Sequence, residues 1–302
     1  MKYNVIFLSG MLSLMLLTGC QDGQSAVSSL ADQSAAVSTV GAASSSAASS
    51  VPDATELSVP DVSAVEEPSA PVVTVVNVTK SRDELIALAG QGEWSWFDDV
   101  VMIGDSVTLK LKNFVAQQRH DDPGYFGGGQ FLSSGSLGSG NSLWEVSDKS
   151  VHPSYQGEKL LLERSIPMTG AKKVYLMLGV NDIAVYGLEG SVENYKTLLS
   201  QIKAAAPEVE FFIQSATPIC EGAEVGALTN ENLKVYNQML LEMCQELGLR
   251  FVDVASVLRD ENGYLPREYC SDPDGMGIHL TDVACQLWLG YLMEDAALSL
   301  GQ

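Results

Sequence analysis

Positive charge is scarce in this chain of 302 residues: 17 Lys and Arg residues stand against 38 Asp and Glu residues, for a formal net charge of −21 at pH 7. By count, about −15 of that charge lies on residues 80–302, −7 on residues 21–79 and +1 on residues 1–20. Partners rich in phosphate are bound by clusters of Lys and Arg. The shortage of such residues argues against nucleic acid as a partner, and against binding of anionic lipid through the domain's own surface.

The chain also lacks a clear membrane-spanning run of roughly 20 apolar residues. Its first residues come nearest, since Val5 to Leu17 is mostly apolar, is interrupted at Gly10 and follows Lys2. A basic residue, a short apolar core and small residues after it form the layout of an export signal. We therefore expect residues 1–20 to direct export.

The end of this signal, Leu17-Thr18-Gly19-Cys20, resembles the lipobox of bacterial lipoproteins. The resemblance implies that Cys20 becomes the new N-terminus and carries the lipid. Several acyl chains on one residue hold a protein at a membrane more durably than one chain does. We expect a lipid-anchored protein on the extracytoplasmic face of the cell membrane.

Residues 21–79 contain no aromatic residue, no Lys and no Arg, and they are rich in Ser, Ala, Val and Pro. Such a composition cannot bury a core, so the segment is predicted to be a disordered tether. As a flexible coil it would reach on the order of 40 Å. A Ser/Ala-rich helix is the alternative, and prolines oppose it only in the second half, at Pro52, Pro60, Pro68 and Pro71.

Cysteine is infrequent too: besides Cys20 there are four, at positions 220, 244, 270 and 285. An exported domain could oxidise them into two bridges, for which three connectivities exist, or leave all four as thiols. The sequence leaves these alternatives open. No Cys-x-x-Cys pair and no His at ligand distance is present, so we predict no zinc site and no cofactor.

Residues 80–302 alternate between short apolar runs and amphipathic stretches, the pattern of a parallel sheet covered by helices. The predicted strands are 100–104, 130–133, 173–179, 209–215 and 250–254. The predicted helices are 107–118, 158–164, 192–206, 231–247 and 282–298. Five such units favour an α/β fold, a three-layer sandwich with a five-stranded parallel sheet, in which ligands bind at the carboxyl ends of the strands.

The loops at these strand ends carry the candidate chemistry. Ser106 directly follows the first strand and starts a helix, where N–H groups and the helix dipole favour negative charge. Asn181 follows the third strand and could donate to a developing oxyanion. A serine there can also serve as a helix cap, and an asparagine as a turn residue.

Only three histidines are present, and His279, in Gly277-Ile278-His279-Leu280-Thr281, precedes the last predicted helix. Its imidazole titrates near neutrality, so it can take a serine proton and return it to a leaving group. His120 and His152 lie in polar contexts and are predicted to be solvated surface residues.

The glycine-rich stretch 124–140 does not form a phosphate-binding loop, because it precedes a strand and no Gly-Lys-Ser/Thr follows. Together, Gly104-Asp105-Ser106, Gly135, Gly179-Val180-Asn181-Asp182 and His279 resemble the Ser, Gly, Asn and His blocks that name the SGNH (GDSL-like) hydrolases. Their order and spacing agree with that family.

The resemblance implies that Ser106 attacks an ester carbonyl and that His279 is the general base. It also implies an oxyanion hole made by the backbone N–H groups of Ser106 and Gly135 and by the Asn181 amide. Gly138 and Gly140 are alternatives to Gly135, because all three glycines follow the second predicted strand.

One position departs from the family pattern. The orienting Asp usually stands three residues before the histidine, and here that residue is Met276. Asp274 is the favoured substitute, Asp272 is a second, and a backbone carbonyl in a Ser–His dyad is a third. Asp272-Pro273-Asp274-Gly275 lacks the spacing of a calcium loop, so no metal is expected there.

The resulting prediction is a membrane-anchored, extracellular serine esterase that removes small acyl groups, such as acetyl, from carbohydrate. The alternatives are an acyltransferase that passes the group to a sugar hydroxyl, and a binding lipoprotein on a degenerate hydrolase fold, which Met276 motivates. Six aromatic residues could stack on a sugar or acyl group, although core packing is more usual: Trp94, Trp96, Phe97, Tyr125, Phe126 and Trp144.

Overall fold

A computed structural model describes residues 76–300, which fall within one compact unit, Ala64–Gln302. The predicted signal with Cys20, and all of the predicted tether before residue 76, lie outside the described residues. Residues 76–79 have no regular secondary structure. Among the described helices, none is long and apolar enough to cross a membrane.

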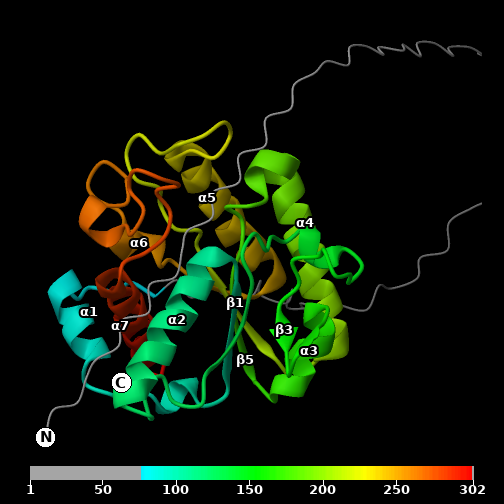
Figure 1. The fold of residues 1–302 in the computed structure, drawn as a ribbon, viewed down its shortest axis with the longest axis horizontal. Coiled ribbons are helices and arrows are strands. Elements are labelled where there is room, and N and C mark those ends of the chain that lie inside the picture. Colours follow the sequence, from blue (N-terminus) through cyan, green and yellow to red (C-terminus); the bar gives the residue numbers. More distant parts are fainter. Residues whose placement is uncertain (1–75, 301–302) are drawn as a thin grey trace, which may run out of the picture. The chain divides into compact units, whose positions relative to one another are not determined.

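The centre of the domain is a five-stranded sheet in the order β2-β1-β5-β6-β7, with every neighbouring pair parallel (Figure 1). Its strands are β1 (Val100–Gly104), β2 (Gln130–Ser133), β5 (Lys173–Met177), β6 (Glu210–Gln214) and β7 (Arg250–Val252). The predicted fold class is confirmed, and β1 and β2 have the predicted bounds.

Helices cover both faces of the sheet, as strands buried on two sides require. Val100 and Met102 of β1 pack into one core and Val101 and Ile103 into the other. The first core includes α1 (Arg82–Ala89), α2 (Ser106–Asp121), α6 (Ala255–Leu258) and α7 (Asp282–Ser299). The second includes α3 (Leu162–Thr169), α4 (Ile183–Ala205) and α5 (Asn230–Leu247).

The strand order places the reversal point of the sheet beside β1. The chain passes from β1 to β2 on one side, then crosses to β5 on the other side of β1. In sheets wound this way, ligands bind outside the carboxyl ends of the strands where the order reverses. Ser106 follows β1 and Asn181 follows β5 by a few residues, so both lie at that edge.

Several predicted elements need correction. The helix predicted over 158–164 begins only at Leu162, because β3 (Ser154–Tyr155) and β4 (Glu158–Lys159) form a hairpin first. Its two turn residues, Gln156 and Gly157, both have positive φ, which is typical of tight hairpins. Helix α4 starts nine residues before the predicted 192 and is kinked at Gly187. Helices α1 and α6 were not predicted.

Candidate active site

Ser106 is held at the junction of β1 and α2. The Asp105 carboxylate accepts a hydrogen bond from the N–H of Val107 at 2.8 Å and caps the helix that Ser106 begins. Gly104 makes this junction possible, since a Cβ there would lie 2.1 Å from Thr108 Oγ1 and 2.7 Å from the carbonyl oxygen of Met177. The serine hydroxyl therefore emerges at a helix N-terminus from a tightly packed turn.

His279 links this serine to a carboxylate. Its Nε2 lies 2.9 Å from Ser106 Oγ, and its Nδ1 lies 2.7 Å from Asp272 Oδ2. The second carboxylate oxygen of Asp272 accepts the backbone N–H of His279 at 3.1 Å. Serine, imidazole and carboxylate form a continuous chain, the arrangement in which a base is oriented by an acid and activates a nucleophile.

The preference for Asp274 as the acid is wrong. Asp274 points to Arg267 in a surface ion pair at 2.7 Å, and 86% of its side chain is exposed. Asp272, the second alternative, lies seven residues before His279 in place of the usual three. Met276, which has the usual spacing, is 59% exposed.

A compact turn returns Asp272 to the histidine. The carbonyl oxygen of Asp272 accepts the N–H groups of Gly275 and Gly277, and the N–H of Ser271 donates to the carbonyl of His279. Burial tends to raise the pKa of Asp272, but its hydrogen bonds from His279 and the Cys270 thiol outweigh burial and lower that pKa. Asp272 is therefore ionised at neutral pH and able to orient the imidazole.

Asn181 lies beside the serine junction and contacts Asp105. Its Nδ2 donates to Leu137 O at 3.1 Å and to Asp105 Oδ2 at 3.3 Å, so both amide hydrogens already have acceptors. Asp105 is 1% exposed, and burial raises its pKa to about 6 against the opposing hydrogen bond from Val107. Gly179, at φ 142°, turns the chain here, and a Cβ on it would strike the Tyr236 ring at 2.3 Å.

Asp182 organises the loop after β2. Its carboxylate accepts the N–H groups of Ser139 at 2.9 Å and Gly140 at 3.0 Å. The N–H of Gly138 donates to Asn141 Oδ1 at 2.8 Å. The two alternatives to Gly135 thus have engaged N–H groups, whereas no acceptor within residues 76–300 takes up the N–H of Gly135.

Sequence reasoning missed the structural roles of Asp105 and Asp182. Both stand inside the blocks that carry the family resemblance, and each directly follows a strand-end segment. A carboxylate at such a position commonly binds the N–H groups of a helix start or a neighbouring loop. In the sequence, each of these carboxylates stands beside a predicted site residue, Ser106 or Asn181, which alone accounts for the pattern.

Residues 156–287 match the model of the GDSL-like lipase/acylhydrolase family. The matched segment contains Asn181, Asp272 and His279, and the structure brings Ser106 from outside it onto that histidine. This match covers 132 of the 302 residues and supports assignment of residues 156–287 to that family. The protein is accordingly an ester-hydrolysing enzyme.

One solved structure that is similar to this hydrolase is a GDSL-like lipase from Bacteroides thetaiotaomicron, with 18% sequence identity and a TM-score of 0.47. The alignment covers 72% of this chain and 97% of that chain. A carbohydrate esterase of family 3 from Talaromyces cellulolyticus shows 16% identity, coverage of 67% and 96%, and a TM-score of 0.43. Likeness at these scores does not define a substrate. No curated protein matches the chain.

Other candidate residues of the hydrolase lie apart from this chemistry. His120 is exposed as predicted, but His152 is buried, with its Nε2 3.2 Å from Ser142 O, so the surface prediction for it is wrong. Four of the six aromatic residues considered for stacking pack in the core: Trp94, Phe97, Tyr125 and Phe126. Trp144 is 58% exposed in the loop after β2 and Trp96 is partly buried.

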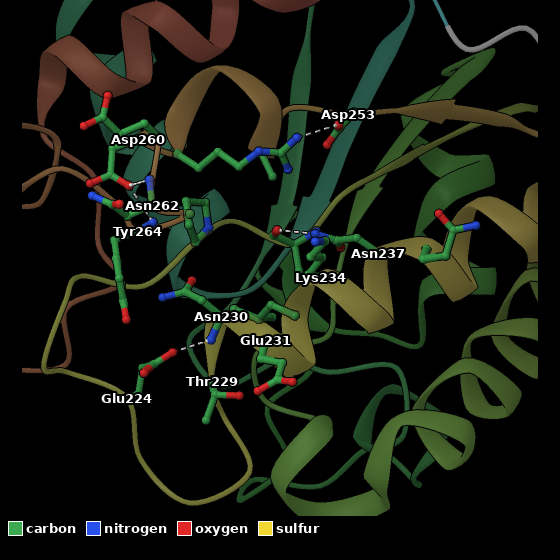
Figure 2. Close-up of a pocket in the computed structure, with 18 of the residues that line it drawn as sticks. Glu224, Thr229, Asn230, Glu231, Lys234, Asn237, Asp253, Asp260, Asn262 and Tyr264 are labelled. Carbon is green, nitrogen blue, oxygen red and sulfur yellow. Dashed lines mark hydrogen bonds and ion pairs between the residues drawn. The ribbon is translucent and has the colours of Figure 1, made fainter.

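A cavity of about 850 Å³ lies at the carboxyl ends of β6 and β7 in the hydrolase (Figure 2). It is not lined by Ser106, Asn181 or His279. Asn230 and Asn237, which face it, use their amides to bind the backbone of Ile219 and Ala216. These two amides therefore fix the loop that follows β6, and the catalytic geometry lies elsewhere.

Proposed function

We propose that this protein is a lipid-anchored, extracytoplasmic serine esterase that removes small acyl groups from carbohydrate through an acyl-serine intermediate. The observation that carries the mechanism is the chain from Ser106 Oγ through His279 to Asp272, with contacts of 2.9 and 2.7 Å. Asp272 supplies the acid that is missing at position 276. Met276 therefore no longer favours a binding protein on a degenerate hydrolase fold.

The proposed reaction has two halves. His279 takes the Ser106 proton as Oγ forms a bond to the ester carbonyl carbon, and the carbonyl oxygen becomes an oxyanion. When the C–O bond breaks, the alcohol leaves with the proton that His279 held. Water, deprotonated by the same imidazole, then attacks the acyl-serine, and the acid product leaves Ser106 with its proton restored.

We assign the oxyanion contacts to the N–H groups of Ser106 and Gly135 and to the Asn181 amide. The first lies at a helix start and the second has no competing acceptor within the described residues, so both are available to a new negative charge. Asn181 must exchange its contact with Leu137 O for the oxyanion. Asp105 Oδ2 keeps the other amide hydrogen and so holds the side chain in place.

The substrate and location rest on the sequence. An export signal ending in Cys20 supports anchoring at the membrane surface, and a tether that reaches on the order of 40 Å would bring acylated polysaccharide outside the cell within range of the domain. Exposed large apolar side chains are spread over loops and several helices, including Met168 on α3, Val185 on α4 and Val235 on α5. Scattered residues of this kind are normal on soluble surfaces, so they do not favour a lipase.

Labelling with a fluorophosphonate serine probe tests the mechanism without a guess about the substrate. We expect Ser106 to be labelled and p-nitrophenyl acetate to be cleaved, and Ser106→Ala to lose both. Ser134→Ala, in the turn after β2, is the matched control and should keep both. Labelling that survives in Ser106→Ala would overturn the proposed nucleophile.

Further measurements address the finer claims. Release of acetate from acetylated xylan or peptidoglycan, with and without an added sugar acceptor, separates hydrolysis from transfer to a hydroxyl. Partition of the membrane-extracted protein into a detergent phase tests the anchor. Incorporation of a labelled fatty acid in cells should be lost in Cys20→Ala, and incorporation that persists in this variant would contradict the lipid at Cys20.

A further inference from the structure

Two cysteines from distant parts of the sequence meet beside the catalytic loop. Cys220 lies in the loop between β6 and α5, and Cys270 lies two residues before Asp272. Both are buried, at 0% and 4% exposure, in the core that α7 shares with the sheet. Each thiol perturbs the pKa of the other, as neighbouring side chains do, and the Cys270 thiol donates to Asp272 Oδ1 at 3.3 Å.

Cys244 is not placed to pair with Cys220 or Cys270. Cys244 is on α5 and packs in the core on the opposite face of the sheet, whereas Cys285 is on α7 with Cys220 and Cys270 on the first face. A bridge needs Cα atoms within about 7 Å, which a partner across the sheet does not meet. Since Cys244 has no partner on its own face, two bridges cannot form in this fold.

The segments carrying Cys220 and Cys270 are fixed against each other. Asn230 binds both the N–H and the carbonyl of Ile219, at 2.8 and 2.9 Å. The N–H of Cys220 donates to Gly277 O at 2.9 Å, and Cys270 forms a β-bridge with Leu280. A bond between the two sulfur atoms would therefore join segments that already lie together.

We propose that Cys220 and Cys270 are oxidised to a disulfide in the exported protein, which fastens the loop bearing Asp272 and His279 to the sheet. The proposal rests on the export argued under the proposed function. An external disulfide is the oxidant: one thiolate attacks it and releases a thiol, and the second thiolate displaces the remaining half. The new S–S bond balances two lost S–H bonds and two released thiols.

The disulfide would form while the domain folds. Burial raises the pKa of Cys220, and raises that of Cys270 to about 12, so both thiols react poorly once the domain is folded. The bridge would replace the thiol hydrogen bond to Asp272, which keeps both contacts to His279. Closing a loop of about 50 residues should raise Tm by roughly 10 °C.

Peptide mapping of the full-length protein, isolated from membranes after alkylation of free thiols, tests the proposal. We expect a cross-linked peptide holding Cys220 and Cys270, with Cys244 and Cys285 free after denaturation. Reduction should lower Tm by roughly 10 °C in the wild type and in Cys244→Ala, and by nothing in Cys220→Ala/Cys270→Ala. Reduction of the wild type remains informative if the double variant does not fold.

Alkylation of all four cysteines, or a bridge that includes Cys244 or Cys285, would overturn the proposal. The same mapping on protein refolded in a glutathione redox buffer separates its two parts. A Cys220–Cys270 bridge in the buffer but not in the cellular protein would overturn oxidation in the cell and count against export. Absence of the bridge in both would refute the pairing, while probe labelling of Ser106 would still report on the esterase.

Discussion

The two aspartates of the Ser271–Gly275 segment provide a matched test of the catalytic geometry. Asp272 accepts the Nδ1 proton of His279 at 2.7 Å, whereas Asp274, two residues later, pairs with Arg267 in solvent. Asp272→Asn keeps the size of the side chain and places a neutral amide against the imidazole. Since the imidazole can then be held in the wrong tautomer, kcat/KM should fall by about 10³- to 10⁴-fold, equal to about 4–5.5 kcal/mol of transition-state stabilisation.

Asp274→Asn, in contrast to Asp272→Asn, should leave both activity and stability close to those of the wild type. It removes an ion pair whose partners are 61% and 86% exposed, and solvent screens such pairs so strongly that they contribute little to stability. We expect kcat/KM within about twofold of the wild type. The assay is p-nitrophenyl acetate turnover, with Tm measured for each variant to confirm folding. An Asp272→Asn enzyme with a tenth or more of wild-type activity, or a tenfold loss in Asp274→Asn, would refute the assignment.

Two further predictions concern Asn181 and Asp295. Asn181→Ala should lower kcat by about 100-fold, near the lower end for an oxyanion donor, because its amide must first leave Leu137 O; a loss under fivefold would argue against that role. Asp295 on α7 is 1% exposed, and burial raises its pKa from 3.8 to about 6 despite its ion pair with Arg250. The folded state therefore holds this proton where the unfolded chain has lost it, so the free energy of unfolding should fall by about 2 kcal/mol as pH rises from 4 to 6. Scanning fluorimetry should show Tm decreasing over this window and a flatter profile in Asp295→Asn; a wild-type Tm that rises steadily with pH would contradict the sign.

The strands of the sheet were predictable because each is a nearly continuous apolar run. β1 is buried at all five positions, and its neighbours differ from their predicted bounds by at most two residues at either end. Placing Ser106 and Asn181 at one edge followed from the parallel order. The contact of Ser106 with His279 followed only from the family resemblance.

Features that depend on the path of irregular segments were not predictable. The choice between Asp272 and Asp274 depends on a turn that closes through the N–H groups of Gly275 and Gly277, which no periodicity encodes. His152 has polar neighbours in sequence, yet it is buried against the carbonyl of Ser142 in the loop after β2. The helix predicted over 158–164 starts too early because Gly157, at positive φ, closes a hairpin whose second strand takes up residues 158–159.

The division of the triad between two kinds of structure has a consequence for heat resistance. Ser106 belongs to a strand and helix junction inside the core, but its acid and base share one short irregular segment, residues 269–281, which is held by the buried side chains of Cys270, Ile278 and Leu280 and by the Cys220 N–H. Loops of this kind open locally at lower free energy than the sheet unfolds. Opening would remove Asp272 and His279 together and leave a folded protein that turns over nothing, so inactivation on heating should precede loss of the fold.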